Sequence, residues 1–188
     1  MKKIIIGALL GGVLYFAYET VMWMGGFHQG FTNYTSNQNA VVQFLSENLT
    51  EDGTYMMPIA DPKSPDYRNE QHKMMESTIG KPWAMIFYHK SMSPMSPIYI
   101  FIGFMYALIA SLITSLILYY GNFKSFGTRF FVSMAFSCYA LCQGVLDDMN
   151  WWSFPWSFIR EQVIDLTLGW AITSVWLAWY VKKSKAVY

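Results

Sequence analysis

Six polar or ionisable residues fall at or near the ends of apolar stretches, where burying charge is costly and a retained charge often has a role. They are Glu19, Gln143, Asp147, Asp148, Arg160 and Asp165. Glu19 lies about 22 Å along a helix that starts at Ile4, at about 1.5 Å per residue. We therefore expect Glu19 and Asp165, which is close to the start of the last apolar stretch, to share a level of the membrane. Such a cluster suits cation binding, proton passage or contact with a lipid headgroup. Alternatively, Arg160 pairs with one or two of the acids and the others only fix the helix register.

Methionine and histidine offer a second chemistry. Nine of the 13 methionines lie within residues 22–95, close to all three histidines. Thioether and imidazole groups suit Cu(I), and the candidate ligands are His72, His89, Met92 and Met95. Methionine also fills irregular cores and protein contacts. The pattern leaves copper handling as one alternative, and we expect no resident cofactor.

The composition indicates which elements carry these residues. Hydrophobic residues make up 54% of the 188 residues and charged residues only 13%, about half the charged fraction of a soluble domain. This argues for a membrane protein and excludes a soluble enzyme. A net charge of +1 without a basic block argues against nucleic-acid binding.

Four apolar stretches are long enough to span a bilayer. They are Ile4–Phe27, Ile98–Tyr120, Phe130–Leu146 and Gln162–Val181. The fold class predicted is membrane all-α: a four-transmembrane-helix bundle with a small α+β extracytoplasmic cap between helices 1 and 2. The first stretch follows two lysines, like a signal peptide, but no small-x-small cleavage site follows it. We therefore expect residues 1–27 to remain as an uncleaved signal anchor.

Positive charges predict the orientation, because they resist translocation. Seven of them fall on one side of the predicted spans: Lys2, Lys3, Lys124, Arg129, Lys182, Lys183 and Lys185. Both termini are therefore expected in the cytoplasm, with residues 28–96 and 147–161 outside. Residues 97–188 would then hold helices 2–4, their short loops and a cytoplasmic tail.

Small residues within the spans predict close helix packing. Gly7 and Gly11 form a GxxxG pair in the first span, and Gly103 and Ala107 belong to a stripe of small residues in the second. Two uses remain open for them: packing within the bundle or docking to another subunit.

The segment at 28–96 is polar but patterned. Helical spacing predicts a helix over 37–49 and a second one over 66–77. Residues 54–57 and 83–89 are typical of short strands that pair with each other. Because this segment holds few apolar residues, we expect it to rest on the bundle or on a partner.

Four segments carry a resemblance. They are Trp23-Met24-(x)3-His28, Asp52-Gly53-Thr54-Tyr55-Met56-Met57-Pro58, Phe87-Tyr88-His89 and Asn150-Trp151-Trp152-Ser153-Phe154-Pro155. Together the chain resembles a family of small four-span bacterial membrane proteins without an assigned activity. The resemblance implies a bacterial inner (cytoplasmic) membrane and a structured outer cap, and it brings no catalytic residues.

Three functions follow from these patterns. The leading prediction is a non-catalytic accessory or scaffolding subunit of a larger membrane complex, of the respiratory or secretion type, whose partners are the lipid bilayer and other membrane subunits. The alternatives are a Cu(I)-handling protein on the outer side, and a small transporter or lipid-interacting protein that uses the outer carboxylates. No nucleotide loop, nucleophile motif or metalloprotease motif points to an enzyme.

Overall fold

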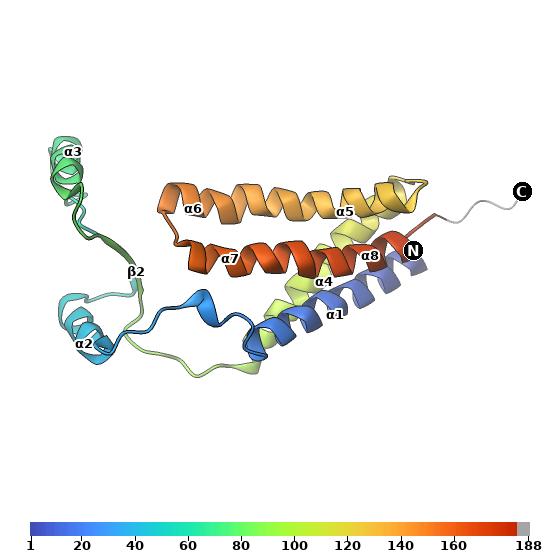
Figure 1. Cartoon of the computed structure of the whole chain (residues 1–188), viewed down its shortest axis with the longest axis horizontal. Helices are drawn as coiled ribbons and strands as arrows, with labels where there is room; N and C mark the ends of the chain where they lie inside the picture. The colour runs from blue at the N-terminus through green and yellow to red at the C-terminus, as the bar shows by residue number, and fades with distance from the viewer. Residues whose placement is uncertain (184–188) are drawn as a thin grey trace, which may run out of the picture. The chain divides into compact units, whose positions relative to one another are not determined.

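The computed structural model describes residues 1–183, which are mostly helical with one two-stranded sheet (Figure 1). The chain divides into two compact units: a helical bundle, and a smaller unit of residues Tyr34–Pro94 that we call the cap. The cap is shorter than the expected 28–96. His28 and the residues up to Asn33 belong to the bundle.

Within residues 1–183, four helical stretches are long and apolar enough to cross a membrane. The first is α1 (Lys2–Met24) and the second α4 (Pro97–Tyr120). The third runs through α5 (Phe126–Ala140), the π-turn η2 (Leu141–Val145) and α6 (Leu146–Trp152). The fourth runs through α7 (Trp156–Ile164), the π-turn η3 (Asp165–Gly169) and α8 (Trp170–Tyr180). This agrees with the predicted four-span architecture.

The third and fourth helices extend beyond their predicted apolar cores. Ser125 caps the start of the third, where its hydroxyl accepts a hydrogen bond from the Thr128 amide at 2.9 Å. Only residues 153–155 separate the third helix from the fourth, and Ser153 there adopts a left-handed conformation with φ of 54°. Asp147, Asp148 and Arg160 are therefore helical residues, because a helix continues past its apolar run wherever its backbone bonds can still form.

Hydroxyl-bearing residues share the interior of the bundle with apolar residues such as Leu118, Leu177 and Val181. The buried serines and threonines are Ser111, Thr114, Ser115, Ser133, Ser137, Thr173 and Ser174. The Ser133 and Ser174 hydroxyls lie 2.7 Å apart, and the Trp170 indole donates to the Ser133 carbonyl at 2.8 Å. Many large apolar side chains of the spans point outwards instead. Lipid rather than water suits such an arrangement, because lipid tails are as apolar as a protein core.

The predicted small-residue seams lie inside the bundle. Gly7 and Gly11 are buried, and a Cβ atom at Gly7 would lie 2.5 Å from Cγ2 of Val181. Ala107 is buried as well, and Gly103 is half-buried. Of the two uses left open by the sequence, the structure supports packing within the bundle, since these surfaces are already occupied by neighbouring helices.

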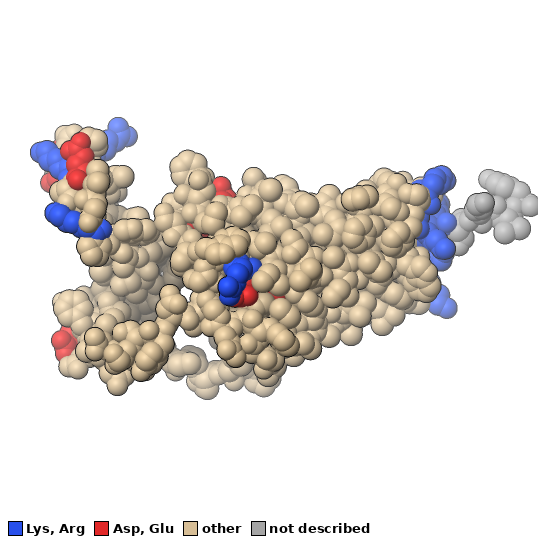
Figure 2. Space-filling view, in the orientation of Figure 1, with Lys and Arg blue, Asp and Glu red and all other residues tan. Residues whose placement is uncertain are grey.

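Lysine and arginine gather at one end of the bundle (Figure 2). Seven positive charges were expected on one side of the spans, and six of them are among the described residues: Lys2, Lys3, Lys124, Arg129, Lys182 and Lys183. The seventh, Lys185, lies outside the described residues. The Lys3 ammonium donates to the Lys182 carbonyl at 3.0 Å. We call this the Lys3 end. The opposite end, where α1 finishes and α6 meets α7, is the Trp23 end.

The cap contains α2 (Gln38–Asn48), β1 (Gly53–Met57), α3 (Tyr67–Thr78) and β2 (Ala84–Tyr88). The two strands pair antiparallel, with Tyr55 opposite Ile86. These elements match the four predicted from the sequence to within about two residues at each end, the usual uncertainty of helix boundaries. Among the cap's apolar residues only Leu49 and Ala60 are buried, so the cap has almost no core of its own.

Candidate functional site

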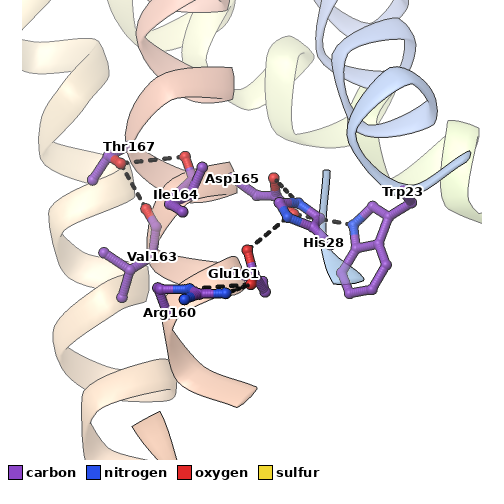
Figure 3. Close-up of polar contacts among 8 residues, drawn as sticks. All are labelled: Trp23, His28, Arg160, Glu161, Val163, Ile164, Asp165 and Thr167. Atoms are coloured by element: carbon purple, nitrogen blue, oxygen red, sulfur yellow. Dashed lines mark hydrogen bonds and ion pairs between the residues drawn. The ribbon is translucent and has the colours of Figure 1, made fainter. Parts of the chain in front are cut away.

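A histidine held between two carboxylates lies at the Trp23 end of the bundle (Figure 3). Nε2 of His28 lies 2.8 Å from Oδ1 of Asp165, and Nδ1 lies 2.7 Å from Oε2 of Glu161. The first contact is a hydrogen bond. The second contact is close enough for an ion pair, but the Glu161 oxygen is not aligned with Nδ1 as a hydrogen bond requires. With Trp23 and Arg160, these three residues form what we call the His28 cluster.

The fourth helical stretch positions both carboxylates. Glu161 and Asp165 are four residues apart and therefore lie on one helical face. Asp165 begins the π-turn η3, where an extra residue widens the helix. The Thr167 hydroxyl donates to the Val163 and Ile164 carbonyls at 2.6 Å and 3.2 Å (Figure 3). These two bonds add side-chain contacts to the backbone directly before the turn, so Thr167 stabilises the turn that holds Asp165.

The chain just after α1 brings His28 to these carboxylates. Gly26 has φ of 76°, a left-handed conformation that glycine adopts without strain. This turn reverses the chain and lets His28 lead into the short helix η1 (Gln29–Phe31). At the end of α1, the Trp23 indole donates to Oδ2 of Asp165 at 3.0 Å. Both oxygens of Asp165 are thus engaged, one by the indole and one by the imidazole.

Aromatic rings shield the cluster from water. The Trp23 ring lies 4.7 Å from the His28 ring and 5.0 Å from that of Phe31, and Phe31 packs 4.5 Å from Phe158 of α7. As a result His28, Glu161 and Asp165 are only 6%, 1% and 6% exposed. Their electrostatic interactions are stronger there than in water.

Arg160 connects the cluster to the surface. Its guanidinium holds Oε1 of Glu161, with Nη2 in close contact and Nε at 3.1 Å, while about half of its side chain remains exposed. A Cβ atom at Gly30 would collide with this guanidinium. The backbone of η1 therefore lies directly against Arg160, and a side chain at position 30 would have to displace the guanidinium.

Three further titratable groups lie near Asp165 on the α1 side. The Tyr18 hydroxyl faces Asp165 but makes no aligned hydrogen bond. Glu19 is half-buried and lies within reach of the Tyr15 hydroxyl, which is one turn earlier in α1. Glu19 was expected to share a level of the membrane with Asp165; in the structure the two carboxyl groups lie close enough to interact electrostatically.

The structure does not bring together all six polar residues singled out from the sequence. Gln143 and Asp147 are exposed and Asp148 is half-buried on the third helix. Arg160 binds Glu161, a residue not among the six, instead of the acids expected to pair with it. Sequence reasoning therefore missed three members of the cluster: Glu161, His28 and Trp23. The spacing of Glu161 and Asp165 on one helical face was a usable signal; nothing local in the sequence indicated that His28 would meet them.

The His28 cluster is not arranged as a metal centre. Its two carboxylates approach opposite sides of the imidazole ring, so their oxygens do not converge on one point. Within residues 1–183, no group of three or more His, Cys, Asp and Glu residues is placed to hold a metal ion.

The four residues proposed for copper are dispersed. His72 on α3 lies 3.3 Å from Glu76, and His89 after β2 lies 3.6 Å from Asp52. The Met92 side chain is almost fully exposed, and Met95 belongs to the bundle unit rather than the cap. Each histidine thus has a carboxylate neighbour of its own, and copper binding by these four stays a prediction from the sequence.

Asp52 is a polar anchor of the cap hairpin. The Lys90 amide donates to Oδ1 of Asp52 at 2.9 Å. This hydrogen bond, and to a lesser extent the nearby His89, holds the pKa of the Asp52 carboxyl below its usual range. The carboxylate form of Asp52 is the one that joins the two ends of the hairpin.

The chemistry available to the His28 cluster is proton binding and charge pairing in a shielded site. Comparison with known proteins adds no assignment: the sequence matches no family model and no curated protein, and the fold matches no solved structure.

Proposed function

We propose that this chain is a non-catalytic accessory or scaffolding subunit of a larger assembly in a bacterial cytoplasmic membrane, of the respiratory or secretion type. Both termini face the cytoplasm and the cap faces outwards, where it docks an apolar segment of another membrane subunit. The orientation rests on the lysines and arginines gathered at the Lys3 end. The docking role rests on the surface of the cap.

One observation carries the proposal: the cap presents an apolar groove lined by methionines. Its volume is about 520 Å³, within the range of pockets that accept a ligand or an anchoring side chain. The apolar lining comes from Met56, Met57, Pro58, Met75, Ile79 and Trp83. Flexible thioether side chains adapt to the shape of a partner, which gives the methionine-rich segment a use that needs no metal.

The exposure of these residues supports a partner. Ile79 is 81% exposed and Met75 61%, a large apolar surface for a segment outside the membrane spans. Val41 and Phe44, three residues apart on α2, add further exposed apolar area. Patches of this kind on soluble surfaces mark interaction sites. The small-residue seams do not compete for this role, because they are already packed inside the bundle.

Photo-crosslinking from the groove tests the proposal. A photoreactive amino acid at Ile79 in the full chain, at native expression, should yield an adduct with a distinct membrane protein. The matched control is Arg68, which is exposed on α3, the helix that ends directly before Ile79, but is not part of the groove lining. No adduct is expected there.

Co-purification in mild detergent gives the second readout. Ile79→Glu should remove the partner by placing a charge in the groove, whereas Arg68→Glu should retain it. A strictly monomeric wild-type protein that also forms no adduct from Ile79 would overturn the proposal.

A further inference from the structure

The close contacts of His28 favour one more proton in the His28 cluster than the ordinary charge states of its members supply. Both ring nitrogens of His28 lie within 2.8 Å of a carboxylate oxygen. A neutral imidazole carries a single N–H, so its other nitrogen would lie against a carboxylate oxygen with no proton between them. Two such close contacts need two protons on the ring, or one on the ring and one on a carboxyl group.

The charge balance leads to the same conclusion independently. Glu161 and Asp165 are buried and contribute two negative charges, while Arg160 contributes one positive charge. Without a further proton the site carries an uncompensated negative charge in a shielded setting, which is unfavourable. One bound proton makes the cluster neutral.

We propose that the His28 cluster is a proton-binding site, in which one labile proton, shared between the imidazole and its two carboxylates, fastens the start of η1 to α7 and η3. The proton neutralises the site when bound. When it leaves, one of the two imidazole–carboxylate contacts becomes repulsive and residues 28–31 separate from the fourth helix. This inference does not depend on the docking role of the cap.

In the part of the chain that the structure describes, the titratable and charged groups that face His28 belong to three elements. Glu161 and Arg160 come from α7, and Asp165 from η3. From α1, Tyr18 faces Asp165, with Tyr15 and Glu19 farther along the helix. Residues Gln29–Phe31 of η1 contribute no titratable group. A negative charge on Glu19 adds to the pull on the bound proton.

The partly exposed Arg160 gives the site a route to solution. It covers Glu161 and leaves about half of its own side chain in contact with solvent. Glu161 therefore lies one side chain away from solvent, and a movement of Arg160 would open the site to protons at the Trp23 end. Because His28 directly precedes η1 and the chain that leads into the cap, the proton concentration on that side would control how firmly this chain is held.

Nitrogen-15 NMR of labelled histidine tests the site directly. The full chain, in detergent micelles and carrying His72→Gln and His89→Gln, retains His28 as its only histidine; both replaced residues are 74% exposed. At neutral pH both ring nitrogens, or one ring nitrogen and a carboxyl, should carry protons, and the loss of one proton should appear as a single transition as the pH rises. Retention of one neutral tautomer, with no transition over the whole pH range in which the protein stays folded, would overturn the proposal.

Two charge-removing variants give opposite expected shifts. Glu161→Gln removes an anion and should move the transition to lower pH, whereas Arg160→Gln removes a cation and should move it to higher pH. Each shift should be on the order of 1 pH unit or more, as expected for a charge at contact distance. Because the two signs are opposite, a general loss of stability in one variant cannot imitate the result. Shifts in the same direction would contradict the assignment.

Hydrogen exchange measured in the same titration tests the mechanical consequence. Amides of residues 28–31 should exchange faster by about tenfold or more above the transition, while amides at the Lys3 end should not change. Loss of the proton without any change at residues 28–31 would show that the site does not fasten η1, and would overturn that part of the proposal.

Discussion

The imidazole of His28 lies 2.8 Å from the carboxylate of Asp165, although 137 residues separate the two in the chain. This contact joins the chain that leaves the first span to the π-turn of the fourth. The Trp23 indole donates to the other oxygen of the same carboxylate, so Asp165 ties α1 and η1 to one point of the fourth helix.

Removal of the Trp23 hydrogen-bond donor should weaken the connection between α1 and Asp165. Trp23→Phe keeps an aromatic ring but leaves Oδ2 of Asp165 without its indole partner, and the free energy of unfolding should fall by about 1–3 kcal/mol. Thermal unfolding in detergent would measure the loss. Trp151→Phe is the control, because Trp151 is 73% exposed and its replacement should change stability by less than about 0.5 kcal/mol.

The two π-turns provide a matched pair of glycines. A Cβ atom at Gly169 would lie 2.5 Å from Cδ1 of Tyr18, whereas one at Gly144 would meet nothing within 4 Å. Gly169→Ala should therefore push α1 away from η3 and destabilise the bundle by about 1–3 kcal/mol. Gly144→Ala should be neutral or slightly stabilising, since alanine favours helix. Equal effects of the two variants on the melting temperature would contradict this packing.

Arg129 should be a structural anchor at the Lys3 end. It is buried, and its guanidinium donates to the carbonyls of Ala178, Phe123 and Lys124 at 2.6, 2.9 and 3.0 Å. Arg129→Met leaves these carbonyls without their donor and should cost about 3 kcal/mol, because hydrogen bonds from a charged group are the strong ones. Abundance in the membrane and thermal unfolding would report the loss. Lys124→Met, which removes an exposed cation nearby, should leave both unchanged.

Acid should loosen the cap hairpin through Asp52. The pKa of this carboxyl is lowered from 3.8 by the Lys90 amide and His89. A lowered pKa means that the contribution to stability is fully present above pH 3.8 and is lost as the pH falls through the folded-state value. Exchange of the Lys90 amide should accelerate in that acid range. Asp52→Asn should abolish the pH dependence, and an unchanged acid response in this variant would assign the effect to another group.

Cysteine labelling should place the cap and the loop between α4 and α5 on opposite sides of the membrane. In a variant without Cys138 and Cys142, a cysteine at Lys63 should react with an impermeant reagent in intact cells. A cysteine at Lys124 should react only after the membrane is opened. Lys63 and Lys124 are both exposed, so access and not burial decides the result. Reaction of both from the same side would reject the topology.

The sequence by itself determined the local structure of this protein. A span of about 20 apolar residues has to form a helix in lipid, because every backbone polar group must be satisfied within the segment. The four spans, the α2 and α3 helices and the β1–β2 pairing followed from such short-range patterns. The positive charges next to the ends of the spans, such as Lys2, Lys3 and Lys182, could also be identified from the sequence, because charge belongs to each residue separately.

Only the tertiary structure decided which polar groups meet. Glu161 and Asp165 share a helical face, and their spacing could be read from the sequence, but their partner His28 comes from a segment that looked like the start of the cap. Arg160 was expected to bind other acids and instead holds its neighbour Glu161. The π-turn that begins at Asp165 also has no local sequence signature. The helical periodicity of the sequence specifies which face of a helix a residue occupies. The packing of α1 against the fourth helix decides which residues lie opposite that face. This packing depends on all the contacts of the bundle together.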